Sequence, residues 1–251
     1  MRVLALDTTS QSGSVALVDE DRIVAERLGD PSRPHAERLP TDLLLLMDAV
    51  GIPLSSVDLF AVAAGPGSFT GLRIGIATMQ GFAVVEHKPI VGISALEAVA
   101  HAVANDVPAG SLVGVWIDAH RRDVFSALYK ASAAPAFTRE RLIELETPTV
   151  GNPSATFARW VERFGPPALI AGDGAVSYGD LVDGPVRVTA SPGLAGTIGL
   201  VAAARARAGE AMDGASVRPL YVRRPDAEIA RDVTQRQEIG SPDIAPRRPQ
   251  R

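Results

Sequence analysis

The first thirty residues alternate short apolar runs with polar turns. The apolar runs, each of strand length, cover residues 3–7, 14–18 and 23–28. Because the turns between them are short, the pattern predicts antiparallel hairpins. Two further apolar runs, at residues 58–64 and 89–93, predict strands farther along the chain.

Two helices predicted near these strands have more apolar surface than one buried face requires. The first, residues 35–50 with a kink expected at Pro40, has one stripe of Leu39, Leu43, Leu46 and Val50, and Leu44 and Leu45 lie outside it. The second, residues 72–85, has one stripe of Leu72, Ile76, Met79 and Ala83 and another of Gly71, Gly75, Thr78 and Phe82. A second stripe predicts either tight packing within the fold or a partner helix.

The second half of the chain repeats the order of the first. Asp118 ends an apolar run and a polar turn follows it, just as Asp7 ends the first strand. Strands are predicted at residues 112–118, 124–129 and 168–171, and helices at 94–105, 154–164 and 194–208. This repeat predicts an α/β protein of two duplicated subdomains with a cleft between them, the organisation of the actin-like (ASKHA, ribonuclease H-like) fold.

The expected boundaries follow from this repeat. Residues 1–107 form the N-terminal subdomain with the two helices rich in apolar residues, and residues 108–222 form the C-terminal one. The last helix of the second subdomain is also able to pack back on the first. Residues 223–251 are rich in Arg, Pro, Asp and Gln without apolar periodicity, which predicts a flexible tail.

The composition of the chain excludes several classes of function. The 251 residues are 46% hydrophobic and 22% charged, which is typical of a globular protein in water. The net charge of -4 argues against a chain that binds nucleic acid by itself. The lack of cysteine excludes disulfides and thiol chemistry. No apolar run has the length of a signal peptide or membrane span, so we expect a cytoplasmic protein that does not contact membranes.

A glycine-rich loop, residues 65–71, joins a predicted strand to the second helix. It lacks the Lys that ends a Walker A motif, since Leu72 and Arg73 follow Gly71. It also misses the dinucleotide fingerprint, because three residues rather than two separate Gly67 from Gly71. The start of a helix can still bind an anion through its N–H groups. The candidate nucleotide or anion contacts are Asp7, Thr8, Gly67 and Ser68, and the alternative is polar turns whose side chains satisfy one another.

Metal and catalytic signatures are missing from the sequence. The histidines are His35, His87, His101 and His120, and no two of them have the four-residue spacing that places two ligands on one helix face. No nucleophile elbow or triad spacing occurs either. We therefore expect no metal ligands and no catalytic residues.

With these motifs in hand, the chain resembles the bacterial TsaB (YeaZ) family of tRNA threonylcarbamoyladenosine biosynthesis proteins. The resemblance rests on the Asp7-Thr8 strand end, on His35 with Arg38-Leu39-Pro40, on the long glycine motif of residues 65–75, on Ile117-Asp118-Ala119, and on residues 219–223. It covers about residues 1–223 and is weakest between residues 130 and 152. The glycine motif is its most specific part.

The resemblance implies an actin-like fold shared with the catalytic subunit TsaD. It implies a non-catalytic assembly subunit that pairs directly with TsaD and, with TsaE, supports threonylcarbamoyl transfer to the adenosine next to the anticodon of tRNAs reading ANN codons. The tRNA is contacted only through the complex. No cofactor is expected to bind tightly to the lone chain, and ATP or ADP and magnesium are left to the complex. TsaD-type enzymes carry a His-x-x-x-His metal pair, whereas here Leu39 stands four residues after His35.

The family's pairing surface lies on the first two helices, where this chain has its surplus apolar residues. The expected interface contains Leu44, Leu45, Gly71, Ile74, Gly75, Thr78 and Phe82, and it forms a homodimer when the chain is alone. Gly75→Arg is expected to abolish pairing and leave the fold intact. The competing hypothesis is a catalytic ATP-dependent enzyme, either a small-molecule kinase or a TsaD-like carbamoyltransferase, that uses Asp7 and Asp118.

Overall fold

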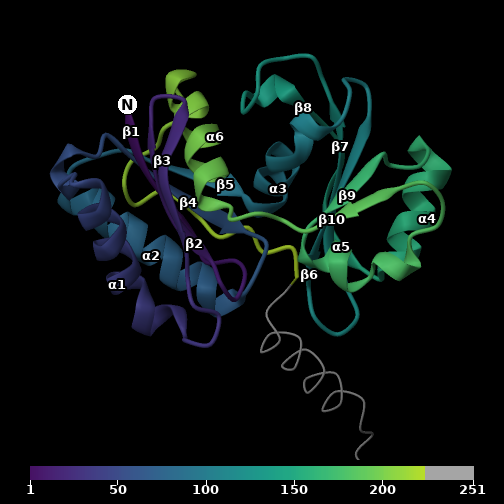
Figure 1. Cartoon of the computed structure of the whole chain (residues 1–251), viewed down its shortest axis with the longest axis horizontal. Coiled ribbons are helices and arrows are strands. Elements are labelled where there is room, and N and C mark those ends of the chain that lie inside the picture. Colours follow the sequence, from purple (N-terminus) through teal and green to yellow (C-terminus); the bar gives the residue numbers. More distant parts are fainter. Residues whose placement is uncertain (224–251) are drawn as a thin grey trace, which may run out of the picture.

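The computed structural model describes residues 1–223 of the 251-residue chain. It contains two five-stranded mixed sheets, with strand orders β3-β2-β1-β4-β5 and β10-β9-β6-β7-β8 (Figure 1). Each sheet and the helices on it form one lobe. Within residues 1–223, none of the helices has the length and apolar character of a membrane span.

The first sheet consists of β1 (Arg2–Asp7), β2 (Ser14–Asp19), β3 (Arg22–Leu28), β4 (Leu59–Gly65) and β5 (Ile90–Ser94). The first three strands are antiparallel neighbours, and β4 and β5 extend the sheet in parallel from β1. The second sheet consists of β6 (Leu112–Asp118), β7 (Val124–Ala131), β8 (Leu142–Gly151), β9 (Leu169–Ala171) and β10 (Arg187–Thr189). Its pairings repeat the same scheme, so the two sheets have one topology.

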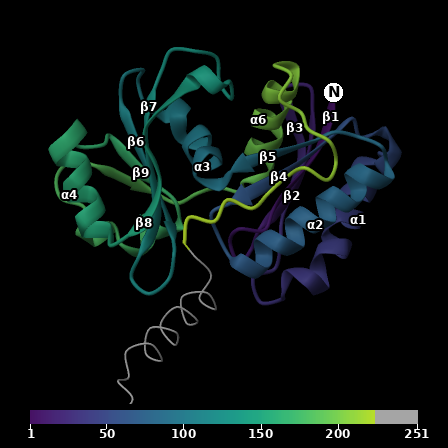
Figure 2. The same cartoon turned by 180° about the vertical axis from the view of Figure 1, so that it is seen from behind.

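Helices cover both faces of each sheet, as Figures 1 and 2 show. The outer face of the first sheet carries α1 (His35–Val50) and α2 (Phe69–Val85), and the outer face of the second carries α4 (Pro153–Phe164) and α5 (Asp173–Ser177). Between the sheets lie α3 (Ala95–Val103) and α6 (Ala195–Arg207). One buried cluster joins both middle helices to both sheets, so the lobes share a core.

The two halves of the chain exchange these middle helices. Helix α6 comes from the second half but packs on β1 and β2, whereas α3 comes from the first half and lies mainly against the second sheet. The chain then returns to the first lobe, where Met212 pairs with Ile90. The expected range 108–222 therefore spans both lobes, and its last helix packs on the first lobe, which is the alternative that the sequence left open. The tail predicted at residues 223–251 lies outside the described residues except for Arg223.

Candidate interlobe cleft and pairing helices

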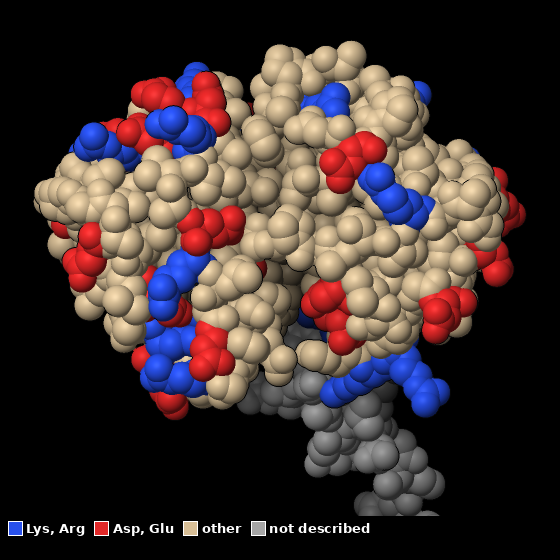
Figure 3. All heavy atoms as spheres, in the orientation of Figure 1, with Lys and Arg blue, Asp and Glu red and all other residues tan. Residues whose placement is uncertain are grey.

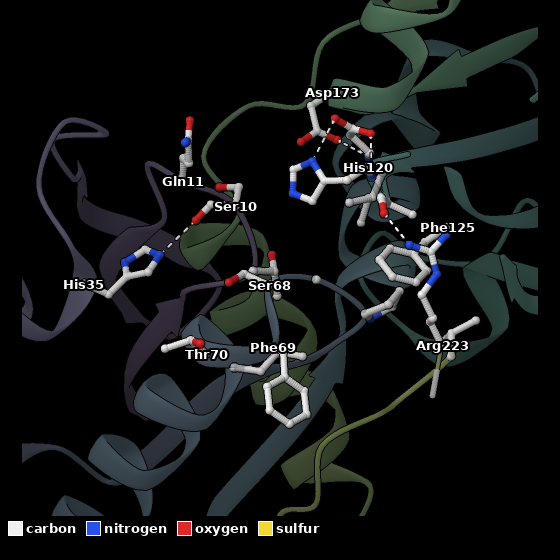
Figure 4. A pocket seen from close by; sticks show the side chains of 18 of the residues that line it. Ser10, Gln11, His35, Ser68, Phe69, Thr70, His120, Phe125, Asp173 and Arg223 are labelled. Carbon is white, nitrogen blue, oxygen red and sulfur yellow. Dashed lines mark hydrogen bonds and ion pairs between the residues drawn. The ribbon is translucent and has the colours of Figure 1, made fainter. Parts of the chain in front are cut away.

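A cavity of about 1030 Å³ lies between the two lobes. The first lobe lines it with residues 9–11, 31–35 and 66–70, and the second with residues 117–120, Phe125 and Asp173. Residues 220–223 complete its wall. Figure 4 shows Ser10, Gln11, His35 and Ser68 on one side of this space and His120 and Asp173 on the other.

The turn after β1 uses its polar groups internally. One Asp7 carboxylate oxygen, Oδ1, accepts hydrogen bonds from the Thr9 N–H at 2.8 Å and from the Thr9 hydroxyl at 2.6 Å. The Thr8 hydroxyl donates to the Gly71 carbonyl at 2.8 Å. Both Asp7 and Thr8 are buried and neither lines the cavity. Burial raises the pKa of Asp7, although the hydrogen bonds from Thr9 oppose this effect. These two candidate anion contacts therefore resemble the self-satisfied turn.

The glycine loop packs closely on the same turn. A Cβ on Gly67 would lie 2.5 Å from the Thr9 Cβ, so only glycine fits there. Ser68 is the N-cap of α2: its hydroxyl accepts from the Gly71 N–H, and its own N–H donates to the Thr9 carbonyl at 3.0 Å. The helix consequently begins at Phe69, three residues before the expected start at Leu72. Gly67 and Ser68 line the cavity, unlike Asp7 and Thr8.

His35 and Arg38, on α1, bond to the turn between β1 and β2. The His35 ring nitrogen Nε2 lies 2.9 Å from the Ser10 carbonyl, and burial lowers the pKa of His35. Arg38 is buried, donates to the Ser12 carbonyl and bonds Asp42 at 2.6 Å. Sequence reasoning gave Arg38 no role, because an arginine on a helix usually faces water. Its signals in the sequence were the acidic residue four positions later and its place in the motif with His35.

The second lobe repeats the strand end of the first. The His120 N–H donates to Asp118 Oδ1 at 2.9 Å, as the Thr9 N–H does to Asp7. Asp118 faces the cavity, and its own N–H donates to Asp173 at 2.9 Å. The three residues that follow Ala119 all have positive φ, between 56° and 65°. The structure thus exposes Asp118 to the cleft but not Asp7, so the two carboxylates do not converge on one ligand.

Two carboxylates, those of Asp118 and Asp173, line the cleft. Among residues 1–223 there is no group of three or more His, Asp or Glu side chains placed to hold a metal ion. The hydroxyls of Thr8 and Thr9 are already engaged with protein groups. Acidic and basic side chains are interspersed on the face shown in Figure 3 rather than gathered by sign.

The expected interface residues divide into three groups. Leu44 and Leu45 on α1 are 64% and 43% exposed. Ile74, Thr78 and Phe82 are half-buried, and Ile74 and Phe82 pack against the core of the first lobe. Gly71 and Gly75 are buried against Thr8. The two glycines therefore face the fold and not a partner, and the expectation that Gly75→Arg leaves the fold intact is wrong.

The exposed side of α2 is a different ridge from the expected one. It contains Phe69, Arg73, Ala77, Gly81 and Val85, four residues apart. Val85 is 72% exposed and the adjacent Val84 51%. A Cβ on Gly81 would meet nothing within 4 Å, so the fold itself does not require glycine there. A four-residue repeat of small residues occurs on both sides of this helix, and the sequence alone could not tell which side faces outward.

Comparisons with known proteins agree with this architecture. The family model described as "TsaD: tRNA N6-adenosine threonylcarbamoyltransferase" matches residues 29–146. A Mycobacterium tuberculosis relative described as uncharacterized is 31% identical over 228 residues, which cover 90% of this chain and 93% of the relative. The TsaB protein of Escherichia coli, a tRNA threonylcarbamoyladenosine biosynthesis protein, is 34% identical over 130 residues. That match covers 52% of this chain and 55% of the E. coli protein.

Solved structures give the same result over nearly the whole fold. YeaZ from Pseudomonas aeruginosa is 29% identical with a TM-score of 0.69, covering 88% of this chain and 99% of YeaZ. The activator of a 2-hydroxyisocaproyl-CoA dehydratase from Clostridium difficile, with a TM-score of 0.50 and 11% identity, shares the fold alone. Two lobes of one topology around a shared core define a protein of the actin-like class. Within that class, the chain belongs to the TsaB (YeaZ) family.

Proposed function

We propose that this chain acts in tRNA threonylcarbamoyladenosine biosynthesis as a non-catalytic subunit that pairs with TsaD. The pathway comes from the names of its TsaB relatives, whose matched stretch is about half their length. TsaE joins the pair in the working complex, and tRNA is contacted through that complex in the cytoplasm. The observation that carries the proposal is the exposed apolar surface of α1 and α2.

The state of the cleft supports a non-catalytic role. An actin-like enzyme needs strand-end carboxylates and hydroxyls that are free to meet its nucleotide. Here Asp7 is buried and hydrogen-bonded to Thr9, and the Thr8 hydroxyl is bonded to Gly71. The alternative of an ATP-dependent enzyme that uses Asp7 and Asp118 is not favoured, because Asp7 does not reach the cavity.

The pairing surface consists of the outward ridge of α2 together with the outward leucines of α1. Four apolar side chains, Leu44, Leu45, Val84 and Val85, are between 43% and 72% exposed. Full burial of such a side chain contributes about 1.5–3 kcal/mol, so this surface offers several kcal/mol before the costs of association. Ala77 and Gly81 lie on the same ridge and are small enough to let a partner helix approach closely. We place the partner here and not on Gly71 and Gly75.

The charges at the two ends of α2 are complementary to those of a second, antiparallel copy of the same helix. Arg73 lies near the N-terminal end of α2 and Glu86 caps its C-terminal end. That arrangement opposes the preference of the helix dipole, and neither residue has an ion-pair partner within 4 Å in residues 1–223. If two copies of α2 cross antiparallel between Ala77 and Gly81, Arg73 of each faces Glu86 of the other. We therefore infer a homodimer of this register when TsaD is absent.

The decisive experiment places a bulky charge on the ridge. Ala77→Arg is expected to abolish co-elution with TsaD on a sizing column, while thermal unfolding stays close to that of the wild type. Ala158→Arg is the matched control, since Ala158 is also exposed in the middle of a helix, α4 of the second lobe. Co-elution of the Ala77 variant with TsaD at wild-type affinity would exclude this surface.

Activity and nucleotide binding separate the two functional hypotheses. The lone chain is expected to modify no tRNA, and its mixture with TsaD, TsaE and a threonylcarbamoyl donor is expected to do so. Calorimetry with ATP or ADP and magnesium should detect no tight binding to the lone chain. Tight binding is expected only with the complex. Tight ATP binding with turnover by the lone chain would establish an enzyme instead.

A further inference from the structure

After α6 the chain returns to the first lobe and stays attached to it from Met212 to Leu220. Met212 exchanges two backbone hydrogen bonds of 3.0 Å with Ile90 at the edge of the sheet. Val217 is buried, and its carbonyl accepts from the Gln80 side chain on α2 at 3.0 Å. The Leu220 N–H donates to the Ala64 carbonyl at 2.7 Å. This segment therefore belongs to the first lobe until Leu220.

Tyr221 seats the segment on the first turns of α2. Its ring packs on Phe69 with 5.4 Å between the ring centroids. Its hydroxyl accepts from Arg73 Nε at 3.0 Å, and the Arg73 guanidinium lies 3.9 Å from the Phe69 ring centroid. Phe69 and Arg73 are also the first two members of the outward ridge of α2. The same residues thus meet both the returning segment and the proposed partner.

Two residues later the chain reaches the other lobe. Arg223 donates to the Ala119 carbonyl at 2.7 Å and forms an ion pair with Asp123, both in the turn between β6 and β7. Its guanidinium also lies 5.9 Å from the Phe125 ring centroid. Figure 4 shows the two side chains next to each other. The Arg223 side chain is 22% exposed and that of Asp123 34%, so the pair is partly shielded from water. Arg223 thereby connects the returning segment, which is attached to the first lobe, to the second lobe.

The second lobe holds its side of this contact in a fixed shape. The Ala119 N–H donates to the Asp123 carbonyl and the Asp123 N–H to the His120 carbonyl, each at 3.0 Å. The three residues between Ala119 and Asp123 all have left-handed backbone conformations. Such backbone geometry is costly for residues other than glycine, so it persists where surrounding contacts determine it.

We propose that residues 217–223 form a strap that sets the opening of the interlobe cleft, with Arg223 as its clasp on Asp123 and Ala119. The shared core of α3 and α6 joins the lobes behind the cleft, and the strap joins them along its wall. Because the strap is anchored on Phe69 and Arg73, pairing on α2 and opening of the cleft are linked. This last link rests on the function proposed above.

The strap can be tested on the full-length chain without interference from native cysteines, because the sequence contains none. Glu37→Cys on α1 and Ser177→Cys on α5 place spin labels at exposed helical positions of the two lobes. Labelled protein diluted into unlabelled protein reports only distances within one chain. We compare wild type with Arg223→Gln, with Arg223→Lys, and with Arg207→Gln, which removes an arginine–aspartate pair confined to the first lobe.

Arg223→Gln is expected to shift and broaden the interlobe distance distribution, with several-fold more molecules outside the wild-type range. Arg223→Lys should restore part of the wild-type distribution, and Arg207→Gln should not change it. The same Arg223→Gln variant should change the affinity for TsaD several-fold. A distribution that superimposes on the wild type, or an equal change in Arg207→Gln, would overturn the strap. Wild-type protein that never pairs would remove the proposed function, yet the distance measurement would still decide the clasp.

Discussion

Gly75 lies directly against Thr8: a Cβ added to Gly75 would come within 2.1 Å of the Thr8 hydroxyl oxygen. One turn earlier, a Cβ on Gly71 would lie 2.2 Å from the Thr8 carbonyl. The missing side chains let α2 sit on the end of β1, and the Thr8 hydroxyl bonds the Gly71 carbonyl. The glycine spacing therefore positions α2 on the first strand and, through it, the outward ridge that we assign to the partner.

Alanine substitutions at two glycines of α2 should have opposite effects. Gly75→Ala forces a methyl group onto Thr8 and is expected to lower the free energy of unfolding by about 1–3 kcal/mol. Gly81→Ala adds a methyl group in open space and should raise it by roughly 0.5–1 kcal/mol, because alanine is the better helix former. Urea unfolding at low protein concentration measures both. Equal effects of the two substitutions would contradict the inward packing of Gly75.

The sequence pattern predicted most elements because their apolar periodicity matched their burial. Helix α1 has the predicted bounds, and Ser94 caps α3 by accepting from the Glu97 N–H. Strand β8 was missed, since its residues Leu142–Gly151 mix charged residues and a proline with few apolar ones. Strand β10, of sequence Arg-Val-Thr, has one apolar residue and so forms no apolar run.

The candidate site was less predictable because it depends on contacts between distant residues. Asp7 and Thr8 were correctly placed at a strand end, but their side chains are used by Thr9 and Gly71, which no local pattern reveals. Tyr221 and Arg223 belong to a motif that was noticed only through family resemblance. Their contacts with Arg73 and Asp123 span 148 and 100 residues.

Because the carboxyl of Asp7 is buried, we expect its contribution to the stability of the fold to decrease as pH rises. Burial raises its folded pKa above the usual 3.8, so the native state binds more protons than the unfolded state between these two values. Stability contributed by the protonated form is therefore present below pH 3.8 and lost as pH rises through the folded pKa. Asn at this position keeps an oxygen for Thr9 and has no charge to bury. Asp7→Asn should gain stability relative to wild type with increasing pH across this window, and a constant difference would contradict the raised pKa.

Glu146 predicts the opposite pH dependence in the second lobe. Arg159 bonds both of its carboxylate oxygens, at 2.7 and 3.0 Å, and Trp160 Nε1 donates to it at 2.8 Å. The hydrogen bonds from Arg159, more than any other influence, hold the pKa of Glu146 below 4.5. The unfolded state then binds more protons, so this stability is present above pH 4.5 and lost as pH falls through the folded pKa.

Glu146→Gln should accordingly cost roughly 1–3 kcal/mol at pH 7 and less as the solution is acidified. Thermal unfolding from pH 7 to pH 3 measures the difference from wild type. Arg163→Gln is the control. Arg163 is 56% exposed and its contact with Glu146 is long, at 3.5 Å, so its loss should change stability little. A Glu146 variant whose deficit stays the same at every pH would show that its ionisation does not matter.

Charge reversal tests the register of the homodimer. In the antiparallel arrangement each substitution affects two symmetric pairs, so Arg73→Glu or Glu86→Arg alone should weaken self-association roughly tenfold at low salt. The double variant Arg73→Glu/Glu86→Arg restores opposite charges across the two-fold axis and should recover most of the affinity. Glu162→Arg on α4 makes the same charge change away from the ridge and should have no effect. Analytical ultracentrifugation gives the dissociation constants. A double variant that associates no better than either single variant would exclude this register. It would not exclude the pairing of α2 with TsaD, because TsaD need not present the same charges to Arg73 as a second copy of this chain does. That pairing is decided by Ala77→Arg.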